Sequence, residues 1–208
     1  MSLAHEEVLS HPDHDIPLEY STEDGVLKIF GFWIFLATDL ILFACLFSMY
    51  QILHLNTAGG PTEQDLYNVP EFMAETLILL VSSFTCGLAT LEMRKGHRGA
   101  LMAWLIVTVL LGLSFIFLEV REFVDYVGRG ATMQRSAFLS SFFTLVGTHG
   151  CHVSLGILWM LSILYQLGRR GIQAITARKV FIVGLYWHFL DVVWVFIFTV
   201  VYLQGVMH

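Results

Sequence analysis

Ionisable side chains occur inside several long apolar stretches of the sequence, where a charge needs either a partner or a purpose. They are the carboxylates and imidazoles of Asp39, Glu75, Glu119, His149, His152, His188 and Asp191. Such groups can move protons, bind metal ions, or hydrogen-bond one another between helices. These residue types therefore predict either a chemical site or a network of polar contacts that holds helices together.

A metal or haem site would need a particular arrangement of these side chains. His149 and His152, three residues apart, could coordinate a metal together with Asp39, His188 or Asp191. A carboxylate-bridged di-iron centre would need Glu-x-x-His on two helices, and the sequence does not contain this motif. Haem ligation would need facing histidines from other helices, because residues three apart point to one side. We expect no cofactor in this chain.

Two further interpretations concern protons and packing. An intramembrane acid such as Asp39 can form part of a proton or ion pathway. Alternatively, the buried groups hydrogen-bond across helices, each acid being protonated or paired with an imidazole. Asp39, His149 and His152 lie at a matched depth, roughly 12–21 Å into their segments, so we expect them to meet. Glu75 and Glu119 are expected within a turn of the outward ends of their segments.

Composition places the chain in a membrane. It has 208 residues, of which 56% are hydrophobic and 13% charged, about half the charge of a typical soluble domain. No basic surplus or glycine-rich phosphate loop indicates nucleic acid or nucleotide binding. Cys45, Cys86 and Cys151 lie far apart in apolar segments, so we interpret them as core residues and not as a disulfide framework.

Segment length predicts an all-α, polytopic membrane protein. Twenty residues between Arg98 and Glu119 and 33 between Arg135 and Arg169 lack a formal charge, while a membrane-spanning helix needs roughly 20. Three more stretches are long enough if each keeps one interior acid. We therefore predict an acidic cytoplasmic tail, 1–27, and a five-helix transmembrane domain, 28–208. The predicted spans are about 28–53, 71–92, 100–121, 138–166 and 180–203.

Basic residues are unevenly distributed between the two sides of this predicted bundle. Alternate sides carry eight and three Lys or Arg residues, and the richer side includes the N-terminus. The positive-inside rule therefore predicts a cytoplasmic N-terminus and a periplasmic C-terminus. Bases on the cytoplasmic side could also meet anionic lipid headgroups. The candidates are Arg94, Lys95, Arg98, Arg169, Arg170, Arg178 and Lys179.

The last two predicted helices have features of interior packing. Small residues four apart, Gly147 with Cys151 and Gly150 with Ser154, allow membrane helices to approach closely. In the fifth span, Trp187, Asp191, Trp194 and Phe198 share one helical face. A carboxylate among large aromatic rings indicates a contact surface between helices.

Several segments together resemble subunit III of the haem-copper respiratory oxidases, from about residue 28 to the end. They are Gly-Phe-Trp-Ile-Phe-Leu-Ala-Thr-Asp at 31–39, Gly-Gly-Pro-Thr at 59–62, Gly-Thr-His-Gly-Cys-His-Val at 147–153, and Tyr-Trp-His-Phe-Leu-Asp-Val-Val-Trp at 186–194. Many members have seven helices, so this chain would lack the first two. The five-helix form, with Thr-Ala-Gly-Gly-Pro-Thr at 57–62 and Phe-Thr-Cys-Gly-Leu-Ala at 84–89, is most similar to subunit III of bacterial cytochrome bo-type ubiquinol oxidases.

The resemblance implies a non-catalytic subunit of a proton-pumping oxidase in the bacterial inner membrane. In that family subunit I holds two haems and a copper, the quinol enzymes use ubiquinone, and subunit III binds phospholipid and supports sustained turnover. The implied partners are subunits I, II and IV and phospholipids, without nucleic acid. Asp39 matches the membrane-buried carboxylate of the family, which is often Glu.

Other functions remain open. The chain could be subunit III of a cytochrome c oxidase, or a relative associated with a nitric oxide reductase. It could also be an independent transporter or proton channel that uses Asp39.

Overall fold

The computed structural model describes residues 17–20, 23–59 and 69–207. Five helices in this part of the chain are long and apolar enough to cross a membrane, which confirms the predicted all-α, five-helix class. They are α1 (Glu23–Leu53), α3 (Val69–Arg94), α4 (Arg98–Gly128), α5 (Ala137–Arg170) and α6 (Ala174–Ile197). A short 3₁₀ turn, η1 (Leu18–Tyr20), precedes them, and α6 continues through a π-helical turn, η2 (Phe198–Leu203), into α7 (Gln204–Met207).

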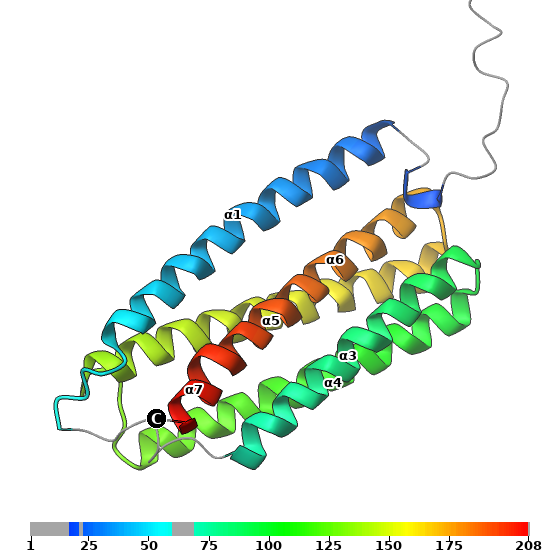
Figure 1. The fold of residues 1–208 in the computed structure, drawn as a ribbon. Coiled ribbons are helices and arrows are strands. Elements are labelled where there is room, and N and C mark those ends of the chain that lie inside the picture. The colour runs from blue at the N-terminus through cyan, green and yellow to red at the C-terminus, as the bar shows by residue number, and fades with distance from the viewer. Residues whose placement is uncertain (1–16, 21–22, 60–68, 208) are drawn as a thin grey trace, which may run out of the picture.

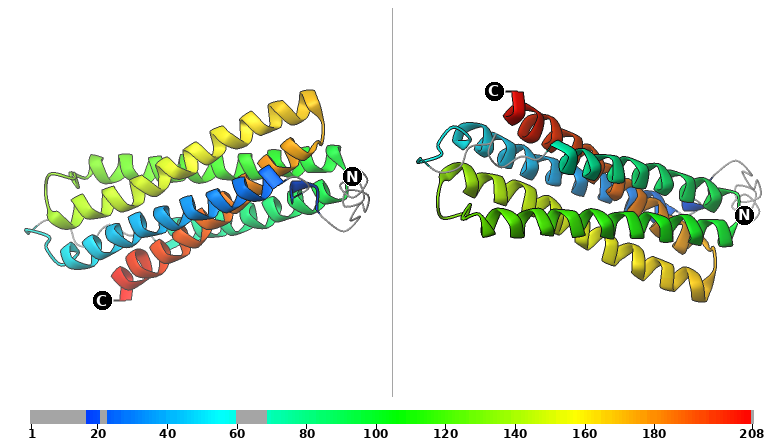
Figure 2. Two further views of the ribbon diagram at one scale, coloured as in Figure 1. Left: turned by 90° about the horizontal axis from the view of Figure 1, so that it is seen from above. Right: turned by 90° about the horizontal axis from the view of Figure 1, so that it is seen from below.

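The bundle is arranged around α5 and α6, which pack on each other (Figure 1). Helix α1 packs on both of them from one side, while the α3–α4 hairpin packs from the other, α4 on α5 and α3 on α6. All five helices run along the length of an elongated bundle (Figure 2). The start of α1 therefore lies at one end and α7 at the other.

Local sequence explains where these helices begin and end. The Ser136 hydroxyl accepts a hydrogen bond from the Leu139 amide at 3.1 Å and so caps the start of α5. Gly171, with φ at +71°, follows the last residue of that helix. Gly96, with φ at +78°, allows the tight turn between α3 and α4. That turn makes α3 and α4 antiparallel neighbours, as their short connection predicts.

Helix boundaries depart from the prediction where charged residues continue a helix past the apolar core. Helix α4 runs to Gly128, whereas the charged residues after position 121 suggested a loop. Helix α1 begins at Glu23, inside the segment 1–27 that we predicted to be a solvated tail. In the same segment Glu19 is buried, with its carboxylate 2.9 Å from Arg94 Nη2. Residues 1–16 of the predicted tail lie outside the described residues.

Large aromatic side chains fill the interior, while the outer surface is apolar as well. Trp194, Phe115 and Phe142 are almost completely buried. Outside, Phe84 and Phe117 are 66% and 68% exposed, which suits a surface that faces lipid or another membrane protein.

Candidate functional site

Asp39 and His152 form a polar contact at the middle of the bundle, between α1 and α5. His152 Nε2 lies 3.4 Å from Asp39 Oδ1. His152 Nδ1 lies 2.7 Å from the carbonyl oxygen of Thr148, one turn earlier on α5. The ring of Phe43 packs against the imidazole with centroids 5.2 Å apart. Both polar side chains are largely shielded. Of the predicted meeting of Asp39, His149 and His152, this contact confirms the part that concerns Asp39 and His152.

The hydrogen bond to Thr148 determines which ring nitrogen of His152 faces Asp39. A carbonyl oxygen can only accept, so Nδ1 of His152 carries a hydrogen. The other ring nitrogen, Nε2, then faces a carboxylate oxygen. The contact therefore joins a ring nitrogen of α5 to a carboxylate oxygen of α1.

His149 does not complete this pair but belongs to the aromatic core. Its side chain is 0% exposed, and Nε2 lies 3.2 Å from the Leu190 carbonyl oxygen of α6. The imidazole packs against Trp194 and Phe115, with centroids 5.2 and 5.8 Å away. A carbonyl partner requires Nε2 to carry the hydrogen, so His149 acts as a hydrogen-bond donor that joins α5 to α6.

A second polar region lies between α3, α4 and η2, at the end of the bundle where α6 continues into η2. Glu122 accepts a hydrogen bond from the Tyr126 hydroxyl and another from the Tyr202 hydroxyl, the latter at 3.2 Å. The three side chains are buried. The predicted third span ended at about residue 121, so sequence reasoning left Glu122 outside it and missed both tyrosines, although the i,i+4 spacing of Glu122 and Tyr126 was a usable signal.

Glu75 and Glu119 lie deeper in their helices than we predicted. Helix α3 begins six residues before Glu75, and α4 ends nine residues after Glu119. Among the described residues, neither oxygen of Glu75 nor Oε1 of Glu119 has a hydrogen-bond partner. Glu75, Glu122 and Arg121 line a cavity of about 210 Å³, and Glu119 packs against the backbone of Gly150.

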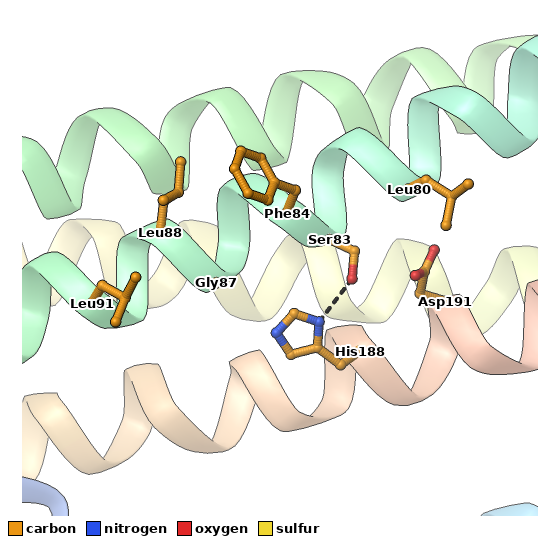
Figure 3. Close-up of a pocket in the computed structure, with 8 residues that line it drawn as sticks. All are labelled: Leu80, Ser83, Phe84, Gly87, Leu88, Leu91, His188 and Asp191. Atoms are coloured by element: carbon orange, nitrogen blue, oxygen red, sulfur yellow. Dashed lines mark hydrogen bonds between the residues drawn. The ribbon is translucent and has the colours of Figure 1, made fainter.

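A third polar group lies on the outside of the bundle, between α3 and α6 (Figure 3). His188 Nδ1 and the Ser83 hydroxyl are 2.7 Å apart. Asp191 follows almost one turn later on α6 and lines the same groove of about 420 Å³, together with apolar residues such as Phe84 and Leu88. His188 and Asp191 are therefore separated from the Asp39–His152 pair and form a surface feature of this chain.

Tryptophan side chains make polar contacts between helices that sequence reasoning missed. Trp187 donates from Nε1 to the Ser82 hydroxyl at 3.0 Å, and Trp194 donates to the Thr76 hydroxyl at 3.1 Å. Both bonds join α6 to α3. In addition, the hydroxyls of Thr85 and Thr108 lie 2.8 Å apart and join α3 to α4. Serine and threonine residues in the sequence did not predict these contacts, because their hydroxyls usually donate to carbonyl groups of their own helix.

The basic residues that we predicted on the cytoplasmic side also contact the protein itself. Arg94 pairs with Glu19, Lys95 with Glu92 at 2.8 Å, and Arg98 donates to the Gly168 carbonyl. Lys179 donates to the Gln166 side chain at 2.6 Å, and the Arg169 guanidinium lies 5.9 Å from the Tyr165 ring centroid. The contacts of Arg94, Arg98 and Lys179 join different helices or segments, whereas those of Lys95 and Arg169 are local, and much of Arg94 and Lys95 stays exposed.

The described part of the chain contains no cluster of side chains arranged to bind a metal ion. Within residues 17–20, 23–59 and 69–207, no three His, Cys, Asp or Glu side chains come together as a group that could hold a metal ion.

The fold and its polar contacts define a multi-pass membrane protein whose ionisable side chains lie mainly between its helices. A family model described as cytochrome c oxidase subunit III matches residues 19–206. The chain therefore belongs to the cytochrome c oxidase subunit III family.

Curated relatives cover nearly the whole chain. Quinol oxidase subunit 3 of Bacillus subtilis is 51% identical over 195 residues, which are 94% of this chain and 96% of the relative. Cytochrome bo(3) ubiquinol oxidase subunit 3 of Pseudomonas aeruginosa is 49% identical over 94% of this chain and 91% of the relative. A probable quinol oxidase subunit 3 of Staphylococcus epidermidis is 45% identical over 96% of this chain and 99% of the relative.

Proposed function

We propose that this chain is the non-catalytic subunit III of a proton-pumping quinol oxidase in the bacterial inner membrane. Its role is to support the assembly, lipid binding and sustained turnover of subunit I, which holds two haems and one copper. Subunits II and IV are its other partners, and the complex uses ubiquinone as the electron donor. The names of the relatives favour quinol over cytochrome c as donor.

The observation that carries this proposal is that polar groups inside the bundle are directed at neighbouring helices. Asp39 contacts His152, His149 contacts the Leu190 carbonyl, and Trp194 contacts Thr76. Such contacts are what a polar residue in a membrane needs when it holds a bundle together. The arrangement therefore suits a scaffold whose redox chemistry is performed by neighbouring subunits.

A lipid site is supported by a groove between α1 and α6. It has a volume of about 490 Å³ and is lined mainly by apolar side chains between Trp33 and Leu40 and between Leu185 and Val192. Arg178 lies seven residues before Leu185, on the same face of α6 and roughly 10 Å nearer the cytoplasmic end. We infer that an anionic phospholipid places an acyl chain in this groove and its headgroup near Arg178.

Purification of the native complex tests the proposed function. A tag on this chain, in mild detergent, should recover a haem-bearing partner with a Soret band, identified by mass spectrometry as the large subunit of a quinol oxidase. The same chain expressed without its partners should show no Soret band. Haem in the isolated chain, or recovery without any haem-bearing partner, would contradict the proposal.

A proton channel is the alternative from a different class, because the Asp39 carboxylate lies inside the bundle in contact with His152. We expect liposomes that contain the purified chain to retain a pH gradient as well as empty liposomes do. Wild-type leakage that disappears in Asp39→Asn would favour the channel.

A further inference from the structure

The short turn η1 joins three helices at one end of the bundle. Nε and Nη2 of Arg94, at the end of α3, both donate to Glu19 Oε1, at 3.1 and 2.9 Å. The Glu19 side chain is fully enclosed. The Tyr20 ring packs edge-on against Phe181 of α6, with centroids 5.6 Å apart. Because α1 begins only three residues after Tyr20, η1 fixes the position at which α1 enters the bundle.

Tyr20 lies in line with the groove between α1 and α6. The α6 wall of that groove runs from Leu185 to Val192. Phe181 precedes Leu185 by one turn on the same face of α6, roughly 6 Å along the helix axis. η1 packs mainly on α6 (Figure 1). The contact of Tyr20 with Phe181 therefore stands at the end of the groove that is nearer the start of α1.

The start of α1 depends on η1 because its own side chains bury little. A smaller share of the apolar segment is buried in α1 than in any of the other four membrane helices. Near its start Val26, Leu27 and Phe30 are 48% to 68% exposed, whereas Ile29 is buried. Farther along, the ring of Phe32 packs on α5 and α6. The part of α1 before Phe32 is therefore the part that would move away from α6 if η1 were released.

We propose that η1 is a latch that sets the width of the α1–α6 groove. With Glu19 on Arg94 and Tyr20 on Phe181, the latch is closed and the start of α1 is held at α6. Loss of the Arg94 cation leaves an enclosed acid without its partner, so η1 detaches and this end of the groove widens. A closed groove retains its lipid, whereas a widened groove exchanges lipid with the bilayer. Lipid as the occupant rests on the proposed function, but the latch itself does not.

Distances between α1 and α6 in the assembled complex test the latch. A ketone-bearing amino acid replaces Leu27 on α1 and Ile175 on α6, both more than half exposed, and each is labelled with a nitroxide. A second labelled pair, at Ile52 and Leu203, reports on the opposite end of the bundle. Pulsed electron paramagnetic resonance in lipid nanodiscs measures both distance distributions. In Arg94→Gln we expect the first to broaden toward longer distances and the second to match the wild type.

Three further variants show whether the effect belongs to the latch. Lys95→Gln removes a neighbouring charge that pairs with Glu92 and should leave both distributions unchanged. Tyr20→Ala removes the ring contact and should give part of the shift. Arg94→Lys keeps a cation and should restore part of the wild-type distribution. An unchanged first distribution in Arg94→Gln, an equal change in Lys95→Gln, or equal broadening of both labelled pairs would overturn the latch.

Lipid exchange separates the latch from the proposed function. The complex is loaded with deuterated phosphatidylglycerol and transferred to unlabelled nanodiscs, and mass spectrometry measures the label that it retains. We expect Arg94→Gln to lose the label several-fold faster than the wild type. If the first distance shifts while exchange is unchanged, the latch stands and the proposed lipid site is wrong. If the tagged chain recovers no haem-bearing partner, the proposed function fails, while the distances in the recovered protein still decide the latch.

Discussion

His152 reaches Asp39 through the one ring nitrogen that the Thr148 carbonyl leaves free, and thereby joins the middle of α5 to the middle of α1. Helix α1 packs on α5 and α6, so this contact is part of what fixes α1 to the bundle.

The Asp39–His152 pair should show an asymmetric response to the loss of either partner. His152→Leu leaves a shielded carboxyl without its imidazole and should cost about 1–3 kcal/mol. Asp39→Leu leaves a neutral imidazole that is still bonded to Thr148, so we expect a smaller loss. The double variant should be more stable than His152→Leu alone. SDS titration of the purified protein measures these differences, and strictly additive effects would show that the two residues are not coupled.

Gly112 should not tolerate a side chain. A Cβ at this position would lie 2.8 Å from Cη2 of Trp187 and 3.3 Å from Ile157 Cδ1. Gly112→Ala should therefore cost about 1–3 kcal/mol through overpacking. Gly147→Ala is the matched control, because its Cβ would meet Phe123 at an ordinary 3.6 Å. Trp187→Phe removes the crowding atoms and should recover part of the loss; equal melting temperatures for the two alanine variants would contradict this account.

Trp194 should stabilise the protein mainly through its ring. The indole packs on Phe115 with centroids 4.8 Å apart and donates one hydrogen bond to Thr76. We expect Trp194→Ala to cost about 3–5 kcal/mol and Trp194→Phe about 1 kcal/mol. Thermal unfolding in detergent distinguishes them. If both variants lose the same stability, the hydrogen bond and not the ring is the main contribution.

Arg94 should hold the N-terminal segment against the bundle. Its guanidinium binds the fully buried Glu19 carboxylate, so Arg94→Gln leaves that acid without its cation. We expect protease cleavage near residues 17–23 to become several-fold faster. Lys95→Gln is the control, because Lys95 pairs locally with Glu92, three residues earlier at the end of α3. Cleavage that is accelerated equally in both variants would argue against a specific anchor.

Much of the fold follows from apolar length. The uncharged stretches around Leu110 and Cys151 are long enough to cross a membrane. The short basic turn near Gly96 makes α3 and α4 antiparallel. Depth along each span also predicted that Asp39, His149 and His152 would meet, and the structure shows the contact of Asp39 with His152. These properties depend on composition and helical rise, which the chain carries locally.

Other features could not be read from the sequence because they depend on how each helix rotates about its axis. His149 and His152 are three residues apart, yet one contacts α6 and the other α1. The partners Ser82 and Thr76 of the tryptophans become recognisable only when α3 and α6 are packed together. The end of α4 was missed for a different reason. Charged residues after position 121 indicate where the apolar segment ends, but the helix continues through them to Gly128.

The wide turn Phe198–Leu203 acts as a spacer near the end of the chain. Its i→i+5 winding accommodates one more residue than an α-helical turn, and Tyr202 lies in it with its hydroxyl on Glu122. Deletion of one residue just before Tyr202 would give a more regular helix. It would also shift Leu203 into the position of Tyr202, opposite the Glu122 carboxylate. The π-helical turn thus places the Tyr202 hydroxyl where it can donate to Glu122.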